Sequence, residues 1–99
     1  MKLIVAIVRP VTIERMVVGF EDIDNFPGLT ISDAAGFGRG PRSAPIDVLD
    51  PFRQGKKIEI VCDDEMTEQI VGVLKNLAHT GKKGDGFIMV LPVEDAIPI

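Results

Sequence analysis

The stretch that decides the fold is KIEIVCDDEMTEQIVGVLKNL, residues 57–77, in which the spacing of apolar residues changes midway. Residues 57–62 alternate apolar and polar side chains, as a strand with one buried face does. Asp63 or Asp64 can then open a helix. Beyond them the apolar residues recur at helical spacing: Met66, Ile70, Val73, Leu74 and Leu77. The stretch therefore predicts a strand followed directly by a helix.

The two ends of the chain predict further strands. Residues 87–91 form an apolar run that Pro92 closes. Residues 2–8 are aliphatic and largely β-branched, and Pro10 ends that run. Both segments are apolar at nearly every position, as strands buried on both faces are.

Between the first strand and residue 57 the sequence predicts a helix, a strand and a long loop. Thr12 can cap the helix, and residues 25–28 (NFPG) end it. Its apolar stripe is Ile13, Met16, Val17, Phe20 and Ile23. Residues 29–34 alternate as a half-buried strand does. Residues 36–55 contain many glycines and prolines without any period. A loop of that length is usually either functional or disordered, and we expect function here.

The predicted order is strand, helix, strand, strand, helix, strand, which is the ferredoxin-like or split βαβ arrangement. We therefore expect an α+β sandwich in which two helices cover one face of a four-stranded antiparallel sheet. The other face should also be apolar, because the outer segments of the chain are apolar throughout. Such a surface favours self-association through the sheet, and the alternative is that the C-terminal tail covers it.

Composition narrows the class of protein. A chain of 99 residues has room for one domain, residues 1–99, and 45% hydrophobic with 26% charged residues predicts a folded one. The net charge of -4 argues against nucleic acid, and the absence of Trp and Tyr argues against RNA stacking on the sheet. No apolar run is long enough to span a membrane. The lone Cys62 fits a small buried residue in a cytoplasmic protein.

Two glycine-rich cationic clusters are the candidate binding loops. One contains Thr80, Gly81, Lys82, Lys83, Gly84, Asp85 and Gly86, and the other begins with Gly36, Phe37, Gly38 and Arg39 and continues to Arg42. The first cluster follows a helix and lacks the GxxxxGK[ST] spacing, so it is not a Walker phosphate loop. Its backbone N–H groups and lysines can form an anion nest, but a plain helix termination fits the same residues.

Other chemistry is poorly supported by the sequence. No acid–base or nucleophile pair is evident, so an enzyme is not expected. His79 stands at a helix end, where a cation suits the helix dipole. The acidic residues at 63–65 and 94–95 fit helix caps or solvated positions, and no histidine or cysteine set completes a transition-metal site.

With these segments placed, the whole chain resembles the PII nitrogen-regulatory signal transduction family. The resemblance rests on RP at 9–10, GFGR at 36–39, KIEIV at 57–61, TGKKGDG at 80–86 and IMVLPVEDAI at 88–97. It implies a homotrimer whose sheets line the centre, with adenine nucleotides bound in clefts between subunits. The family's B-loop, here about residues 80–86, holds phosphates, and residues 36–39 correspond to the base of its T-loop. The T-loop, here about residues 37–56, reaches a target enzyme or membrane transporter.

The departures from the family pattern change the expected ligand. Phe87 stands where the family carries a phosphate-binding lysine, Pro98 replaces an arginine, and a second arginine would fall beyond Ile99. Because several charge-assisted contacts are missing, we expect weak ATP binding. ADP, AMP or bicarbonate remain as candidate effectors, and Arg39, Lys82 and Lys83 are the expected anion donors, supplemented by Arg42 and Arg53.

The T-loop also differs from the family pattern, because the chain lacks the tyrosine that uridylylation requires. We therefore interpret the chain as a divergent, non-enzymatic PII-like regulator. The alternative is a metal-binding trimer of the divalent-cation tolerance type, which has a similar architecture and normally offers metal ligands.

Overall fold

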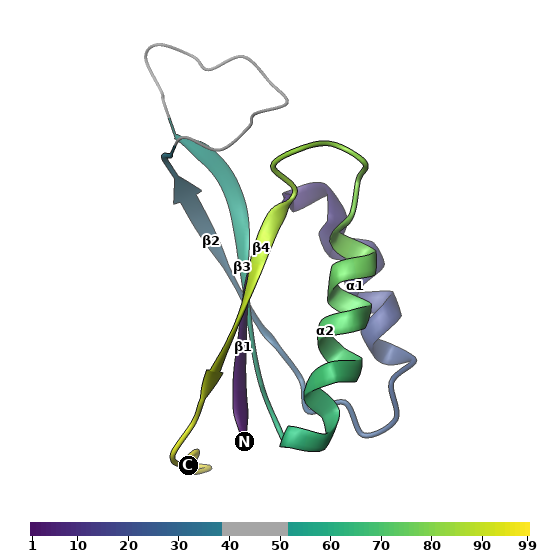
Figure 1. Cartoon of the computed structure of the whole chain (residues 1–99), viewed down its shortest axis with the longest axis vertical. Coiled ribbons are helices and arrows are strands. Elements are labelled where there is room, and N and C mark those ends of the chain that lie inside the picture. The colour runs from purple at the N-terminus through teal and green to yellow at the C-terminus, as the bar shows by residue number, and fades with distance from the viewer. Residues whose placement is uncertain (39–51) are drawn as a thin grey trace.

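The computed structural model describes residues 1–38 and 52–99 and shows one sheet with two helices (Figure 1). The strands are β1 (Lys2–Val8), β2 (Thr30–Gly36), β3 (Arg53–Cys62) and β4 (Gly86–Pro92). The helices are α1 (Ile13–Glu21) and α2 (Asp64–Ala78), and a 3-10 turn, Pro10–Thr12, precedes α1. The predicted ferredoxin-like α+β class is confirmed.

The sheet has the strand order β2-β3-β1-β4, and each neighbouring pair is antiparallel. Strands β2 and β3 are longer than the alternating pattern predicted. Their pairing runs on from Ser32 opposite Lys57 to Gly36 opposite Arg53. Backbone pairing does not depend on side-chain alternation, so the ladder continues through small and polar residues where the pattern gives no signal.

Both helices lie on the same side of the sheet (Figure 1). The core between them consists of alternate residues of the two central strands and the inner faces of the helices. Its members are Ile4, Ala6, Val8, Met16, Phe20, Ile23, Ile58, Ile60, Cys62, Ile70 and Leu74. Most of each helical stripe predicted from the sequence therefore faces the sheet, but Val17 is 38% exposed and is not among the residues that pack on the core. Cys62 is buried, as expected.

The start and end of α1 differ in detail from the prediction. Thr12 is buried, and its hydroxyl donates to the carbonyl oxygen of Arg9 at 2.8 Å instead of capping the helix. The helix ends at Glu21, so Ile23 lies in the following turn and still packs on the core. Asn25 and Gly28 adopt positive φ angles of 59° and 103° in that turn, a conformation that Asn and Gly tolerate best.

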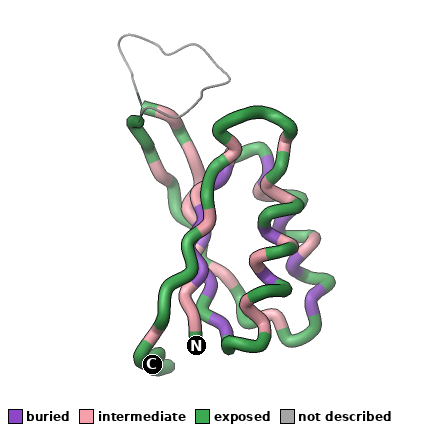
Figure 2. Tube along the Cα trace, viewed as in Figure 1, coloured by how far each residue is buried: buried purple, intermediate pink, exposed green. Residues whose placement is uncertain are grey.

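The second face of the sheet is not covered by either helix. Because Ile4, Ala6 and Val8 point into the core, the odd-numbered residues of β1 point the other way. Pairing places the neighbouring residues of β3 and β4 on that side too. We call the apolar members the open face: Leu3, Val5, Ile7, Val61, Phe87, Met89 and Leu91. Edge strand β4 is largely exposed, in contrast to β1 (Figure 2).

No helix within the described residues is long and apolar enough to cross a membrane.

Candidate functional site

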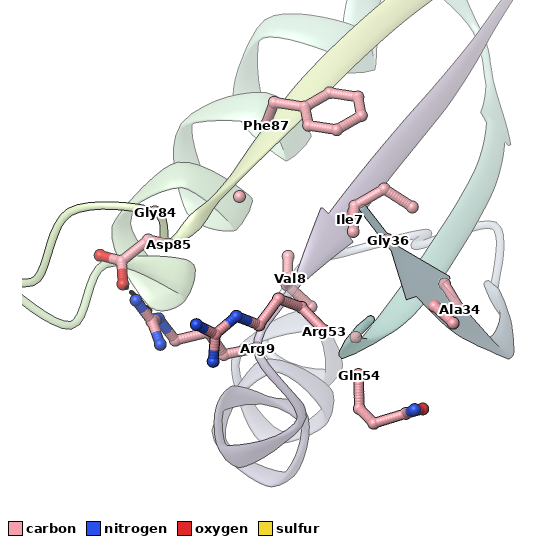
Figure 3. A pocket seen from close by; sticks show the side chains of 13 residues that line it. Ile7, Val8, Arg9, Ala34, Gly36, Arg53, Gln54, Gly84, Asp85 and Phe87 are labelled. Atoms are coloured by element: carbon pink, nitrogen blue, oxygen red, sulfur yellow. Dashed lines mark hydrogen bonds and ion pairs between the residues drawn. The ribbon is translucent and has the colours of Figure 1, made fainter. Parts of the chain in front are cut away.

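A cleft of about 530 Å³ lies on the open face where β1 ends, β2 ends and β4 begins (Figure 3). The chain turns at this edge bring together segments that are far apart in the sequence. The lining residues are Ile7, Val8, Arg9, Ala34, Ala35, Gly36, Arg53, Gln54, Gly55, Gly84, Asp85, Gly86 and Phe87. One end of each candidate loop therefore reaches the same cleft.

The loop between α2 and β4 is organised around the carboxylate of Asp85. Oδ2 accepts a hydrogen bond from the backbone N–H of Thr80 at 2.7 Å, and Oδ1 accepts one from the Thr80 hydroxyl. Nε of Arg9 also donates to Oδ1 at 2.9 Å. These bonds, the Thr80 hydroxyl first, lower the pKa of Asp85 from 3.8 to about 2. The carboxylate thus stays ionised and holds both ends of the loop together.

Arg9 connects this loop to the end of β1. Besides its bond to Asp85, its Nη2 donates to the carbonyl oxygen of Lys83 at 2.9 Å. One guanidinium group therefore contacts a side chain and a backbone carbonyl of the same loop. The loop position is fixed relative to the sheet by a residue more than seventy positions earlier in the chain.

Arg15 of α1 fixes the other end of the loop, where α2 stops. Its Nε donates to the carbonyl oxygen of Leu77 at 2.7 Å, and its Nη2 donates to that of His79 at 2.9 Å. These carbonyls are among those that have no partner within a helix at its C-terminal end. Arg15 satisfies them and so places Thr80 where its amide can reach Asp85.

The loop glycines have backbone conformations that other residues rarely adopt. Gly81 and Gly84 have φ angles of 86° and 80°, and Gly86 has a φ of 131°. A Cβ atom on Gly86 would also overlap the backbone carbonyl of Ile7. Glycine at 86 therefore allows β4 to begin in close contact with β1, which sets the position of Phe87 beside the cleft.

The structure brings some of the predicted site residues together and leaves others apart. Gly36, Gly84, Asp85 and Gly86 line the cleft. Thr80, Gly81, Lys82 and Lys83 belong to the loop but not to the lining. Phe37 is 71% exposed and meets Phe52 edge-on, with ring centroids 6.2 Å apart, and a Cβ atom on Gly38 would meet none of the described atoms within 4 Å. Arg39 and Arg42 lie outside the described residues.

The sequence did not predict several residues that line the cleft. Arg9 was noted only as part of a family marker. Arg53 was predicted as a supplementary anion donor from the T-loop, and it lines the cleft from the first position of β3. Figure 3 shows the Arg9 and Arg53 guanidinium groups on the Asp85 side of the cleft. The signal for Arg9 was its place directly after a buried strand, where side chains often reach a site.

The charges of the lining leave the cleft cationic. The described lining residues include two guanidinium groups, of Arg9 and Arg53, and one carboxylate, of Asp85, so two minus one leaves a net charge of +1. Within residues 1–38 and 52–99 no three histidine, cysteine or acidic side chains gather as a metal site would require. The arrangement suits an anionic group placed beside apolar side chains.

Comparison with known proteins identifies, over the whole chain, the family that the sequence resembles. The sequence model of the family described as "Nitrogen regulatory protein P-II" matches residues 1–99. A nitrogen regulatory protein P-II of Azospirillum brasilense is 32% identical over 103 residues, and one of Bradyrhizobium diazoefficiens is 33% identical over 103 residues. A nitrogen fixation nifHD region GlnB-like protein 2 of Methanothermococcus thermolithotrophicus is 33% identical over 119 residues. Each alignment covers 100% of this chain and 91% of the relative. The chain therefore belongs to the nitrogen regulatory protein P-II family.

Proposed function

We propose that this protein is a PII-like homotrimeric signalling protein, without enzymatic activity, that binds a small anionic effector in clefts between subunits. The effector is an adenine nucleotide with few phosphates, such as ADP or AMP, or bicarbonate. The bound state is passed to a target enzyme or membrane transporter through the segment at about residues 37–56. A cytoplasmic location is part of the proposal.

The observation that carries the proposal is the cationic cleft at the rim of an apolar, uncovered sheet face. Four members of that face are large side chains with considerable exposure: Phe87 at 54%, Met89 at 45%, Val61 at 41% and Leu91 at 39%. A contiguous apolar surface of this kind is typical of an interaction site. Copies that meet through it would bring a second subunit up to the cleft, so one chain would supply only part of the site.

The ligand part of the proposal rests on the donors at the cleft. Guanidinium groups suit phosphate and carboxylate groups because their N–H donors match two oxygens at once. Backbone at Gly36 and Gly84 has no side chain to keep a ligand away from the peptide groups.

Two measurements test this function. Sedimentation at micromolar concentration should give the mass of a trimer, and a monomer would contradict the assembly. Calorimetric titration with AMP, ADP, ATP, cyclic nucleotides and bicarbonate should give saturable heat with at least one of them. No response to the whole panel would remove the sensor role even if the trimer is found.

A further inference from the structure

Phe37 and Phe52 form an aromatic pair where β2 ends and β3 begins. Their rings meet edge-on, with centroids 6.2 Å apart. Neither side chain packs on the core, and they are 71% and 52% exposed. Such exposed rings add little to the packing of the sheet on the helices. The contact between them therefore needs a reason other than the stability of the core.

The aromatic pair continues the ladder between β2 and β3 by one step. The last paired residues of the two strands are Gly36 and Arg53. Because the strands are antiparallel, Phe37 and Phe52 are the next two positions in the same register, beyond the ends of both strands. Directly opposed side chains of an antiparallel ladder interact, and aromatic pairs do so favourably. The rings thus hold the two chain segments together past the last backbone pair.

The aromatic pair lies next to the cleft without lining it. Gly36 and Arg53 are lining residues, and side chains at the following positions of a ladder point to its other face. Phe37 and Phe52 are not among the lining residues, in agreement with this alternation. The two rings can therefore act on the cleft only through the residues whose positions they fix.

Arg53 is the lining residue that depends most on this contact, because it stands at the end of the ladder. The ends of secondary structure elements open more readily than their middles. The Nε atom of Arg53 is nevertheless buried, and Figure 3 shows its guanidinium group at the cleft, near that of Arg9. A ring contact one position beyond the terminal pair opposes opening at this residue.

We propose that the aromatic pair is a positioning element for Arg53. The contact between Phe37 and Phe52 keeps β2 and β3 paired up to their ends, and the paired backbone holds the Arg53 guanidinium group in the cleft. The inference rests on the proposed function only where it treats Arg53 as an anion donor, because the contact and its effect on the ladder are properties of the chain without any ligand.

The test is amide hydrogen exchange of the full-length protein, followed by NMR, in the wild type, Phe37→Leu, Phe52→Leu and the double variant. Leucine keeps an apolar side chain but removes the ring. Each single substitution should speed exchange at the protected amides of residues 34–36 and 53–55 about two- to tenfold, the factor that an aromatic contact contributes to an equilibrium. The Nε–H group of Arg53 should also exchange faster with water.

The double variant and a conservative variant separate the ring contact from a general effect of substitution. Because either leucine alone already removes the contact, the double variant should accelerate exchange by less than the product of the two single effects. Phe37→Tyr keeps the ring at an exposed position and should retain wild-type exchange rates. Amides of α2 should exchange at the wild-type rate in every variant, because the aromatic pair does not pack on the core.

Three results would overturn the inference: unchanged exchange at the ends of β2 and β3 in both leucine variants, single effects that multiply fully in the double variant, or faster exchange of the backbone with an unchanged Arg53 Nε–H group. No ligand enters these measurements. Failure of the calorimetric panel would therefore remove the effector role without deciding the role of the aromatic pair, and the exchange rates decide that role in either case.

Discussion

Both faces of the sheet carry apolar residues, but these residues are buried to different extents within the single chain. On the helix side, Ile4, Ala6, Ile58 and Ile60 are almost completely buried within the chain. On the open face, large apolar side chains such as Met89 and Leu91 remain about 40% exposed or more. The difference teaches that hydrophobicity alone does not tell whether a residue stabilises the single chain or an assembly. The following predictions test that distinction.

Leu74→Ala should have the largest effect on the stability of the single chain. Leu74 is fully buried between α2 and the sheet, so its truncation leaves a cavity that the packed neighbours cannot close. We expect the free energy of unfolding to fall by about 2–5 kcal/mol in urea denaturation. Val18→Ala, an exposed site on α1, should change it by about 0.5 kcal/mol or less. Equal losses would mean that the helix side is not the core.

Gly86→Ala should come next, because it acts where the open face meets the cleft. The substitution would place a Cβ against the Ile7 carbonyl and require a φ of 131° from an alanine. We expect a loss of about 2–3 kcal/mol, measured by urea denaturation.

Gly72→Ala is the matched control for Gly86→Ala. Gly72 lies within α2 and has open space at its Cβ position, so alanine there should raise stability by about 0.5–1 kcal/mol. Destabilisation by both substitutions to a similar degree would show that crowding at β1 is not the cause.

Met89→Ala on the open face should affect assembly more than the single chain. Because Met89 is already 45% exposed, its truncation should lower the stability of a dissociated monomer by only about 1 kcal/mol. The midpoint concentration of self-association should rise, measured by sedimentation over a dilution series. An unchanged midpoint would mean that this part of the face lies outside any subunit contact.

The smallest expected effect is a change in acid stability from Asp85→Asn. The bonds from Thr80 and Arg9 lower the pKa of Asp85 from 3.8 to about 2 in the folded chain. As the pH falls, this carboxyl therefore binds a proton in the unfolded chain before it does so in the folded chain. The stability that the carboxylate contributes is complete above about pH 4 and is lost toward pH 2. The variant should show a flatter decline of Tm between about pH 4 and pH 2.

Asp24→Asn, which removes an exposed carboxylate in the turn after α1, controls for the change in net charge. If Tm falls as steeply with pH in Asp85→Asn as in the wild type, the hydrogen bonds around Asp85 do not contribute to acid stability.

The candidate site was only partly predictable. The glycine clusters at 36–38 and 80–86 stood out because glycine patterns are visible in sequence. The contacts from Arg9 to Asp85 and to Lys83 join positions 76 and 74 residues apart, and nothing local in either segment indicates its partner. Phe87 was noticed as a departure from a family pattern, but its place at the end of an open cleft comes from the pairing with β1.

The sequence by itself determined the order of elements and the faces of the helices, because the spacing of apolar residues is a local property of strand and helix geometry. It also indicated that more of the sheet is apolar than two helices can cover. Only the tertiary structure decided how far β2 and β3 extend, which arginines meet the loop, and where the cleft opens. Those features depend on strand pairing and on contacts between distant segments, and neither is encoded in the pattern of neighbouring residues.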